Sequence, residues 1–420
     1  MKNDFEVVSL NESESMILNC IRRNNGLFTK AELAENLNVP WSTVSTSVTS
    51  LLKRNMVIVE NNHNNKSYKG KLFINSSHKF YVGVSIGHSK IKIVIMDFAF
   101  DILKESDILK IDSQTGEQDN EIYCIMNKFC DKLSYMNFEK DNSQCYKWCC
   151  PTPNTIPEIR EKMMQVTRAI IDLKKSNFYV DAIGIALPGH INFDSQKIVK
   201  SFEDKSDCFL NTTIASILST SLINELADNS IKVYIDHNVK SSTIGEKEAM
   251  LMYRKEIDQE NILNLYLGVG LSLGIIYNNR LCRGTANLAG EVGKCIDTKN
   301  DITLEKKLNK IIYKNSNKEW NDKCIDNFAE NDEIDTFVDL LCVSLSNLVS
   351  ILGITMIVCS GKFEKIFPCI ELKMMNKFLD MKKAEINLIK SYYGEYSAAI
   401  GCAIEAYYNV HNLPIQWNVK

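Results

Sequence analysis

Hydrophobic residues near the start of the chain recur at helical spacing in two segments. Residues 12–24 place their apolar side chains on one face, which predicts an amphipathic helix with Ser13 as its N-cap. Thr29 and Glu32 then form the sequence pattern of a capping box, which predicts a second helix over residues 30–37.

A third helix and a β-hairpin are expected next. Pro40 stands where a helix can begin, because the N–H that proline lacks has no intrahelical partner there. The predicted helix extends from Trp41 to Arg54, and its inner face is formed by Val44, Val48, Leu51 and Leu52. Residues 56–60 and 68–74 alternate as two strands around a polar turn. Three helices followed by a hairpin make a winged helix-turn-helix, which we place in residues 1–75.

After Lys79 the pattern alternates between strands and helices, which is typical of an α/β fold. Strands are expected at residues 80–86, 90–97, 181–186, 231–235, 262–268, 272–277 and 355–359. Helices are expected at residues 117–135, 158–175, 239–252, 333–352 and 398–408. Residues 137–157 are polar and contain Cys and Pro, so we interpret them as a surface loop.

Composition narrows the possible classes of protein. The chain has 420 residues and a formal net charge of −3, so nucleic-acid binding would require a local basic region. The N-terminus is acidic and no apolar stretch follows it, which is unlike a signal peptide. The most apolar window, residues 337–359, includes Asp339 and several polar residues, so we interpret it as a core helix and a buried strand. We therefore expect a cytoplasmic protein without membrane contact.

The predicted helix-turn-helix has the basic region. Residues 1–80 contain ten Lys or Arg against seven Asp or Glu, whereas the rest of the chain is net acidic. Small hydroxyl and basic side chains of the kind that contact phosphates and base edges are expected on the outer side of the third helix and on the wing. The expected DNA-binding residues are Ser42, Thr43, Ser45, Thr46, Thr49, Lys53, Arg54 and Lys66. The alternative is an ordinary solvated helix face.

Two glycine motifs indicate a ligand site. Gly268 and Gly270 lie in a predicted strand–turn–strand, where backbone N–H groups can approach a phosphate or a sugar, although a plain hairpin has the same pattern. Further on, Glu291 stands between Gly290 and Gly293, where it can accept hydrogen bonds from ligand hydroxyls or simply close a helix-end turn.

Together these motifs resemble the ROK family of repressors, open reading frames and sugar kinases. The resemblance extends over nearly the whole chain and includes the segments Ile183–Gly189, Asn347–Gly361 and Gly394–Ala403. It implies an α/β fold of two actin/hexokinase-like (ribonuclease H-like) lobes with a sugar cleft between them. The implied domains are the helix-turn-helix at 1–75, a first lobe at 76–195 completed by 395–420, and a second lobe at 196–394 with a dimerisation surface.

The resemblance also implies the sugar-binding residues Asn211, Asn238, Glu291 and Glu305, while the kinase motifs are altered. The first phosphate loop of the family, Asp-x-Gly-Gly-Thr, is replaced by Ser85 to Ser89, in which His88 stands for the second glycine. The catalytic Asp of the family falls on Asn238, and an amide cannot accept the proton of a sugar hydroxyl. A shift of two residues would instead use Asp236 as the base.

No metal or other cofactor is expected. The zinc motif of the family begins Gly-His and continues with cysteines, but here Lys294 follows Gly293 and only Cys295 remains before Glu305, too few ligands for a structural zinc. Cys145, Cys149 and Cys150 are an alternative metal site, although their spacing matches no common one.

These observations predict a non-enzymatic regulator that represses carbohydrate genes, binds an operator in double-stranded DNA and responds to a sugar effector. A homodimer or higher homo-oligomer is expected, because a winged domain usually needs two half-sites for adequate specificity. One alternative is an active sugar kinase with an N-terminal appendage, and another is a regulator whose cleft no longer binds sugar.

Overall fold

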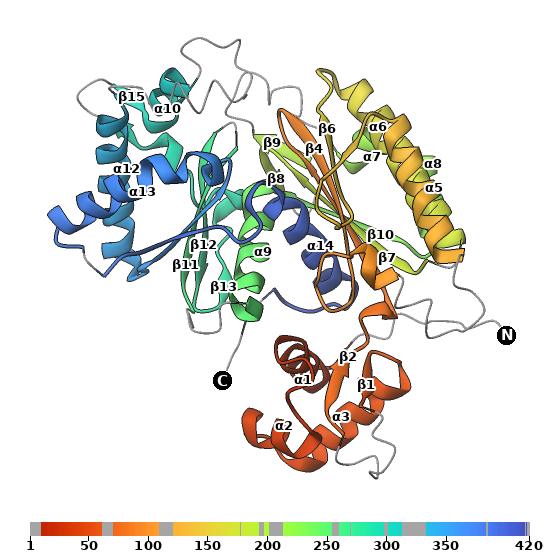
Figure 1. Cartoon of the computed structure of the whole chain (residues 1–420). Helices are drawn as coiled ribbons and strands as arrows, with labels where there is room; N and C mark the ends of the chain where they lie inside the picture. Colours follow the sequence, from red (N-terminus) through yellow and green to blue (C-terminus); the bar gives the residue numbers. More distant parts are fainter. Residues whose placement is uncertain are drawn as a thin grey trace.

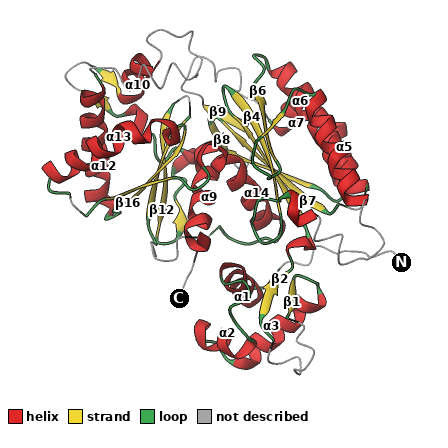
Figure 2. Ribbon diagram, viewed as in Figure 1, coloured by secondary structure: helices red, strands yellow, loops and turns green. Residues whose placement is uncertain are grey.

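A computed structural model describes most of the chain (Figure 1). The described residues are 10–60, 70–108, 121–176, 178–192, 197–200, 213–253, 260–268, 270–297, 301–312, 333–383, 385–415 and 417. Figure 2 shows two large sheets with helices between and outside them, and a small helical unit below.

The small unit consists of three helices and a two-stranded sheet. Its elements are α1 (Glu12–Arg23), α2 (Lys30–Leu37), α3 (Trp41–Lys53), β1 (Val57–Val59) and β2 (Leu72–Ile74). The capping box of α2 is confirmed, since the Thr29 hydroxyl accepts from the Glu32 N–H. The expected Ser13 cap of α1 is wrong: Asn11 is the N-cap and forms a reciprocal capping box with Glu14. An Asn followed three residues later by Glu satisfies two of the N–H groups that a helix start leaves unpaired.

The core of this unit forms where the apolar pattern predicted it. Val44, Val48 and Leu51 on α3 are fully buried. Strand β1 pairs antiparallel with β2, with Val57 opposite Ile74. The turn between them, including Lys66, lies outside the described residues.

The first large sheet has six strands in the order β10-β7-β3-β4-β6-β5. These strands are β3 (Phe80–Ile86), β4 (Lys90–Met96), β5 (Glu139–Lys140), β6 (Lys147–Pro151), β7 (Val180–Leu187) and β10 (Lys232–His237). Strands β10, β7 and β3 are parallel, and β4 and β6 continue the sheet antiparallel. Helices α5 (Glu121–Tyr135) and α6 (Ile156–Lys175) pack against each other and bury their apolar faces in the core of this sheet.

The surface loop expected at residues 137–157 is wrong. The segment contains β5 and β6, and β6 pairs along β4 with Trp148 opposite Ile93. Trp148 and Cys150 are buried while Lys147 and Pro151 are not, so this strand has the alternation of a half-buried sheet position. The polar residues nearby obscured a two-residue period that was present in the sequence.

The second large sheet has five strands in the order β13-β12-β11-β16-β17. They are β11 (Ile262–Leu267), β12 (Leu271–Tyr277), β13 (Arg280–Leu281), β16 (Met356–Gly361) and β17 (Asn387–Lys390). As in the first sheet, an antiparallel hairpin is extended by parallel strands that follow helices. Helices α10 (Leu304–Ile312), α12 (Ile334–Leu352) and α13 (Phe363–Asp380) contribute to the core on its outer face.

Helix α12 also has the length and composition of a membrane span, with a mean hydropathy of 1.6 over its most apolar window. Phe337, Leu341 and Leu345 of this helix are fully buried in the core between the second large sheet and its outer helices, as expected for the core helix predicted there.

Two helices, α9 (Asn238–Tyr253) and α14 (Ser397–Val410), lie between the large sheets (Figure 1). Helix α14 packs on β3 and β7 at two glycines, because a Cβ on Gly83 or on Gly184 would lie 1.9 Å from a carbonyl oxygen of α14. Helix α9 packs on β12 in a similar way, since a Cβ on Gly274 would lie 1.7 Å from the Thr243 hydroxyl.

The remaining elements are short and lie around the cleft or at the edges. They are β8 (His190–Asn192), β9 (Lys197–Lys200), α7 (Ile214–Ile217), α8 (Thr220–Asp228), β14 (Ile296–Asp297), β15 (Ile302–Thr303), and the 3₁₀ turns η1 (Ser76–His78), η3 (Thr285–Asn287), η4 (Val292–Lys294) and η5 (Gly394–Tyr396).

The helical unit is attached to the α/β body through Arg22 of α1. The Arg22 side chain is buried over the rings of Phe100 and Tyr407, with 4.0 Å and 4.6 Å from the guanidinium carbon to the ring centroids. Its Nε also donates a hydrogen bond to the carbonyl oxygen of Phe98, at 3.2 Å. Next to it, Arg23 lies 3.9 Å from the buried carboxylate of Glu248 on α9.

Candidate functional site

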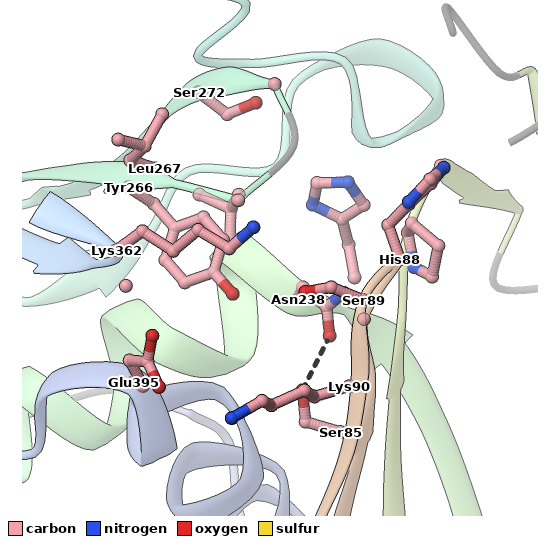
Figure 3. A pocket seen from close by; sticks show the side chains of 18 of the residues that line it. Ser85, His88, Ser89, Lys90, Asn238, Tyr266, Leu267, Ser272, Lys362 and Glu395 are labelled. Atoms are coloured by element: carbon pink, nitrogen blue, oxygen red, sulfur yellow. Dashed lines mark hydrogen bonds between the residues drawn. The ribbon is translucent and has the colours of Figure 1, made fainter. Parts of the chain in front are cut away.

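A cleft lies between the two large sheets, at the strand ends nearest the start of α9 (Figure 3). Three of the four residues expected to bind sugar line it: Asn238, Glu291 and Glu305. The fourth, Asn211, lies outside the described residues. Residues from remote parts of the sequence therefore meet in one cleft, as the resemblance implied.

Asn238 is the first residue of α9 and is almost fully buried. Its amide oxygen accepts a hydrogen bond from the Ser85 hydroxyl at 3.3 Å (Figure 3). Its amide nitrogen donates to the Ile86 carbonyl at 3.3 Å. Both positions at which the resemblance implies an aspartate are thus neutral and contact each other. Neither side chain can serve as a general base, although the amide can still bind a hydroxyl.

The alternative alignment, with Asp236 as the base, is wrong. The Asp236 side chain is fully buried and forms an ion pair with Arg283, with 2.7 Å between Oδ2 and Nη1. Arg283 also binds Glu405 of α14 at 2.9 Å. Burial and the neighbouring Asp236 raise the pKa of Glu405 well above its ordinary value. Asp236 belongs to this buried network and does not line the cleft.

Glu291 lies in the cleft because of the glycine before it. Gly290 has a φ of +95°, and a Cβ there would lie 1.7 Å from the Leu273 carbonyl oxygen, so the loop can lie flat on β12 only with glycine. The buried Lys240 of α9 donates a hydrogen bond to the carbonyl of Ala289 at 2.6 Å and thereby holds the loop against α9. Burial lowers the pKa of this lysine to about 8.

Glu305, at the start of α10, faces Lys294 across the cleft wall. The Lys294 ammonium lies 3.4 Å from both carboxylate oxygens. Since Lys294 stands where the zinc motif of the resembled family has histidine, the side chain that replaces a metal ligand here forms an ion pair with a predicted sugar ligand.

The altered phosphate loop also borders the cleft. Ser85, Gly87 and His88 line it, and they face the turn that contains Gly268 and Gly270. The Gly268 N–H donates to the Gly270 carbonyl at 3.0 Å, so the turn closes on itself as in a tight hairpin. The bulk of the His88 imidazole lies where the family pattern has a glycine.

The comparison with known proteins is decisive at the level of the family. The family model described as "ROK family" matches residues 130–407, about two thirds of the chain. The chain belongs to the ROK family. The predicted fold class is confirmed as well: a solved ROK family transcriptional regulator, described as a homologue of the E. coli MLC protein, superimposes with a TM-score of 0.62 at 12% identity, over 95% of this chain and 97% of that one.

The proteins that this chain is similar to include both repressors and sugar kinases. The xylose repressor of Bacillus subtilis is 21% identical over 285 residues, which are 67% of this chain and 59% of that protein. The xylose repressor of Caldicellulosiruptor bescii is 22% identical over 64% of this chain and 55% of that protein. A ROK glucokinase from Streptomyces griseus, solved with glucose and AMPPNP, shares the fold with a TM-score of 0.51 at 14% identity, over 78% of this chain and 99% of that one. This chain therefore spans somewhat more than half the length of the xylose repressors that it matches.

Sequence reasoning missed four charged residues that line this ROK cleft. Lys90 and Lys92 from β4, Lys362 before α13, and Glu395 in η5 all line it. A signal existed for two of them, because Glu395 lies in a segment that carries the family resemblance and Lys362 directly follows another such segment at Gly361. The β4 lysines alternate with buried isoleucines, which indicated a strand but gave no sign of a ligand site.

No group of three potential metal ligands occurs in the part of the chain that the structure describes. Cys149 and Cys150 are successive residues of β6, so their side chains point to opposite faces of the sheet and cannot share an ion. The absence of a structural zinc remains a prediction.

The outer side of α3 has the predicted small polar residues. Ser42, Thr46, Thr49 and Lys53 are exposed, and Thr43 and Ser45 are half-buried. Arg54 differs, because its guanidinium binds the Glu14 carboxylate at 2.8 Å inside the helical unit. Arg54 was expected near DNA phosphates, and that contact stays a prediction beside this ion pair.

Proposed function

We propose that this ROK protein is a DNA-binding transcriptional regulator, a repressor of carbohydrate genes that acts in the cytoplasm and senses a sugar in its cleft. One observation carries the proposal: a three-helix unit with a hairpin is joined to a cleft that keeps Glu291 and Glu305 but has an amide, Asn238, at the catalytic position. A cleft that retains hydroxyl acceptors and lacks a base is suited to binding a sugar without phosphorylating it.

The relatives named xylose repressors support this function. Since the chain spans little more than half of their length, operator, effector and oligomeric state are proposals of ours for this chain. We propose that residues 1–75 bind the operator and that the protein is a homodimer. The two lobes are proposed near the limits expected from the sequence, except that β10, which was expected in the second lobe, pairs with β7 in the first sheet.

In the proposed complex, α3 enters the major groove. The outward hydroxyls of Thr43 and Thr46 contact base edges, while Ser42, Ser45, Thr49 and Lys53 lie near the sugar-phosphate backbone. We propose that Lys66 on the wing adds a phosphate contact. Salt-dependent phosphate contacts then supply much of the affinity, and the two threonines supply sequence choice.

The sugar response requires that the ligand bind two conformations with different affinity. The proposed ligand contacts come from both lobes: Asn238 lies against β3 of the first sheet, whereas Glu291 and Glu305 belong to segments packed on the second. A sugar held by all three stabilises one relative position of the lobes, and Asn211 is proposed as a further hydroxyl ligand.

The experiment is selection of binding sites from a random duplex pool by the full-length protein, followed by fluorescence anisotropy on the selected site. The Thr43→Ala, Thr46→Ala double variant should lose preference for the selected site, at about 1–3 kcal/mol per lost base contact, and keep most non-specific binding. Lys53→Ala should weaken binding to all duplexes alike. The matched control is Lys128→Ala, which removes an exposed lysine on α5. Failure to select any sequence, or a double variant with unchanged preference, would overturn the assignment.

A sugar kinase with an N-terminal appendage is the competing function. The neutral Ser85 and Asn238 argue against it, since loss of a general base alone costs about 10²–10⁴-fold in rate. A coupled assay with ATP, Mg²⁺ and a panel of hexoses and pentoses distinguishes the two. Sugar-dependent ADP release near 1 s⁻¹, in the ordinary range of kinases, would refute the regulator assignment.

A further inference from the structure

A separate cavity, here called the junction cavity, lies where the helical unit meets the α/β body. The helical unit contributes residues of α1 and α2 to its lining, and the body contributes the end of α14 and the segment after it. None of the described residues that line it belongs to the cleft between the sheets. Its volume is about 440 Å³, within the range of about 300–1,000 Å³ that small-molecule sites have. At about 30 Å³ for a water-sized group, it has room for about 15 such groups.

Much of the lining of the junction cavity is apolar. Met16 of α1, Leu37 at the end of α2 and Leu413 after α14 contribute half-buried side chains. Tyr408 and Trp417 line it as well, and each is only 1% exposed. A ligand seated there would remove apolar surface of both parts of the molecule from water, which favours binding.

Arg23, the last residue of α1, is the cationic side chain of this lining. Only 14% of the side chain is exposed. Its guanidinium lies 3.9 Å from Oε2 of Glu248, beyond hydrogen-bond distance, and it donates no hydrogen bond to any residue that the structure describes. Its five N–H donors are therefore largely removed from water without an acceptor, and the oxygens of a ligand would provide one.

Glu248 neutralises Arg23 only in part. Its Oε1 accepts hydrogen bonds from the Tyr408 hydroxyl at 2.6 Å and from the Trp417 indole N–H at 2.5 Å. Its charge also acts on Arg22, the buried arginine that precedes Arg23. Two guanidinium groups therefore share one carboxylate, which leaves one positive charge for a ligand to balance.

The other polar groups of the lining do not supply that negative charge. Glu12 is the one carboxylate among the described residues that line the cavity. It begins α1, and at 1.5 Å per residue it lies about 16 Å from Arg23 along the helix axis. The carbonyls of Ala34 and Tyr408, in the last turns of α2 and α14, already accept hydrogen bonds from N–H groups that follow each helix. The cavity therefore combines one cationic end with an apolar lining.

We propose that the junction cavity binds a small carboxylic acid with an apolar body, such as an aryl or branched-alkyl acetate. Its two carboxylate oxygens accept from the Arg23 guanidinium in the paired geometry that arginine provides, and its apolar body lies against Met16, Leu37 and Leu413. Because the ligand contacts α1 and α2 on one side and the segment after α14 on the other, its binding stabilises the attachment of the helical unit to the body. This second effector site depends neither on sugar binding nor on the operator.

The test is calorimetry with the full-length protein and matched probes: phenylacetate, indole-3-acetate and 3-methylbutyrate, each beside its uncharged amide. At least one acid should bind at least tenfold more tightly than its amide, because the amide cannot form the charge-assisted pair. Arg23→Met should remove that preference, and Arg23→Lys should keep only part of it, since an ammonium group lacks the planar fork. The matched control is Arg168→Met, which removes an exposed arginine of α6 and should leave binding unchanged.

Met16→Trp is a second variant, which leaves Arg23 and its contact with Glu248 in place. The larger ring fills the cavity, so the variant should bind the acid at least tenfold more weakly, while thermal unfolding checks that it folds. In the unsubstituted protein, bound acid should slow hydrogen exchange of the α1 amides relative to those of β3.

Absence of binding by all three acids, equal affinity of each acid and its amide, or binding that both Arg23→Met and Met16→Trp retain would overturn the inference. An acid whose binding is lost in Lys362→Met and kept in Arg23→Met would overturn it as well, because that acid occupies the cleft between the sheets.

Discussion

The contact of Arg22 with the α/β body offers a sharp test of how the helical unit is held. The perturbation is Arg22→Lys, which keeps a positive charge at the site and removes the planar guanidinium. Lysine is more strongly hydrated than arginine and cannot donate from a position equivalent to Nε. The substitution therefore removes a hydrogen bond and the stacking of a planar group on the rings. It keeps the desolvation cost of a buried positive charge, which a neutral side chain would remove.

The magnitude can be worked from the contacts. The Phe98 carbonyl loses its donor at 3.2 Å, and an unsatisfied buried acceptor costs about 1–3 kcal/mol. Contacts of the cation with the Phe100 and Tyr407 rings are worth about 0.5–2 kcal/mol each, and only part of that is lost with lysine. We expect a total of about 2 kcal/mol, which corresponds to about 30-fold in an equilibrium constant.

The assay is native-state hydrogen exchange, with protection of the α1 amides compared with that of β3 and β7. Exchange in α1 should accelerate about 30-fold in Arg22→Lys, and that in the central strands should stay unchanged. The matched control is Arg23→Lys, which makes the same change at the adjacent residue, where the partner oxygen of Glu248 is 3.9 Å away. Equal exchange in the two variants would refute the argument that Arg22 attaches the helical unit.

Two further predictions concern the cleft and the pH dependence of stability. Glu291→Ala should weaken binding of the sugar ligand roughly ten- to a hundredfold in calorimetry, because stranding a buried hydroxyl costs about 1–3 kcal/mol, and unchanged affinity would place the ligand elsewhere. Burial lowers the pKa of His411 to about 3, so the unfolded chain takes up a proton below pH 6.5 while the folded chain does not. Stability should therefore fall as the pH drops from 6.5 towards 3, by up to about 1.4 kcal/mol per pH unit, and His411→Phe should show a shallower slope in urea denaturation. A slope identical to that of the unsubstituted protein would contradict this assignment.

Periodic segments of the chain could be predicted from the sequence because local patterns decide them. The limits of α2 and α3 and the buried face of α3 follow from caps and spacing that a dozen residues contain. Strand β6 was missed because its two-residue alternation is short and is surrounded by polar residues. Its assignment depends on pairing with β4, about fifty residues earlier in the chain.

The residues of the candidate site could be predicted only where the sequence keeps a motif of the ROK family. Asn238, Glu291 and Glu305 were found by motif, and the structure brings them to one cleft. The lysines of the cleft could not be found in this way, because Lys90 and Lys362 are 272 positions apart and only the folded sheets bring them to the same cleft. Whether an aspartate such as Asp236 faces a ligand or an internal arginine is likewise a property of tertiary packing.

The glycines at the centre of the molecule set the spacing of its layers. Gly83 and Gly184 bring α14 against the first sheet, a Cβ on Gly401 would lie 1.6 Å from the Ser241 carbonyl oxygen of α9, and Gly274 brings α9 against the second sheet. Three of these contacts are to backbone carbonyl oxygens and the fourth is to the short Thr243 side chain, so no long side chain lies at these four points to absorb a displacement. A shift of β12 should therefore displace α9 and α14 together with it, because close-packed contacts that cannot be compressed pass the displacement from one layer to the next. The first residues of α9 line the cleft, and Glu248 near its other end contacts Arg23 of α1. The rigidity of this packing therefore determines how much of a displacement at the cleft reaches the helical unit.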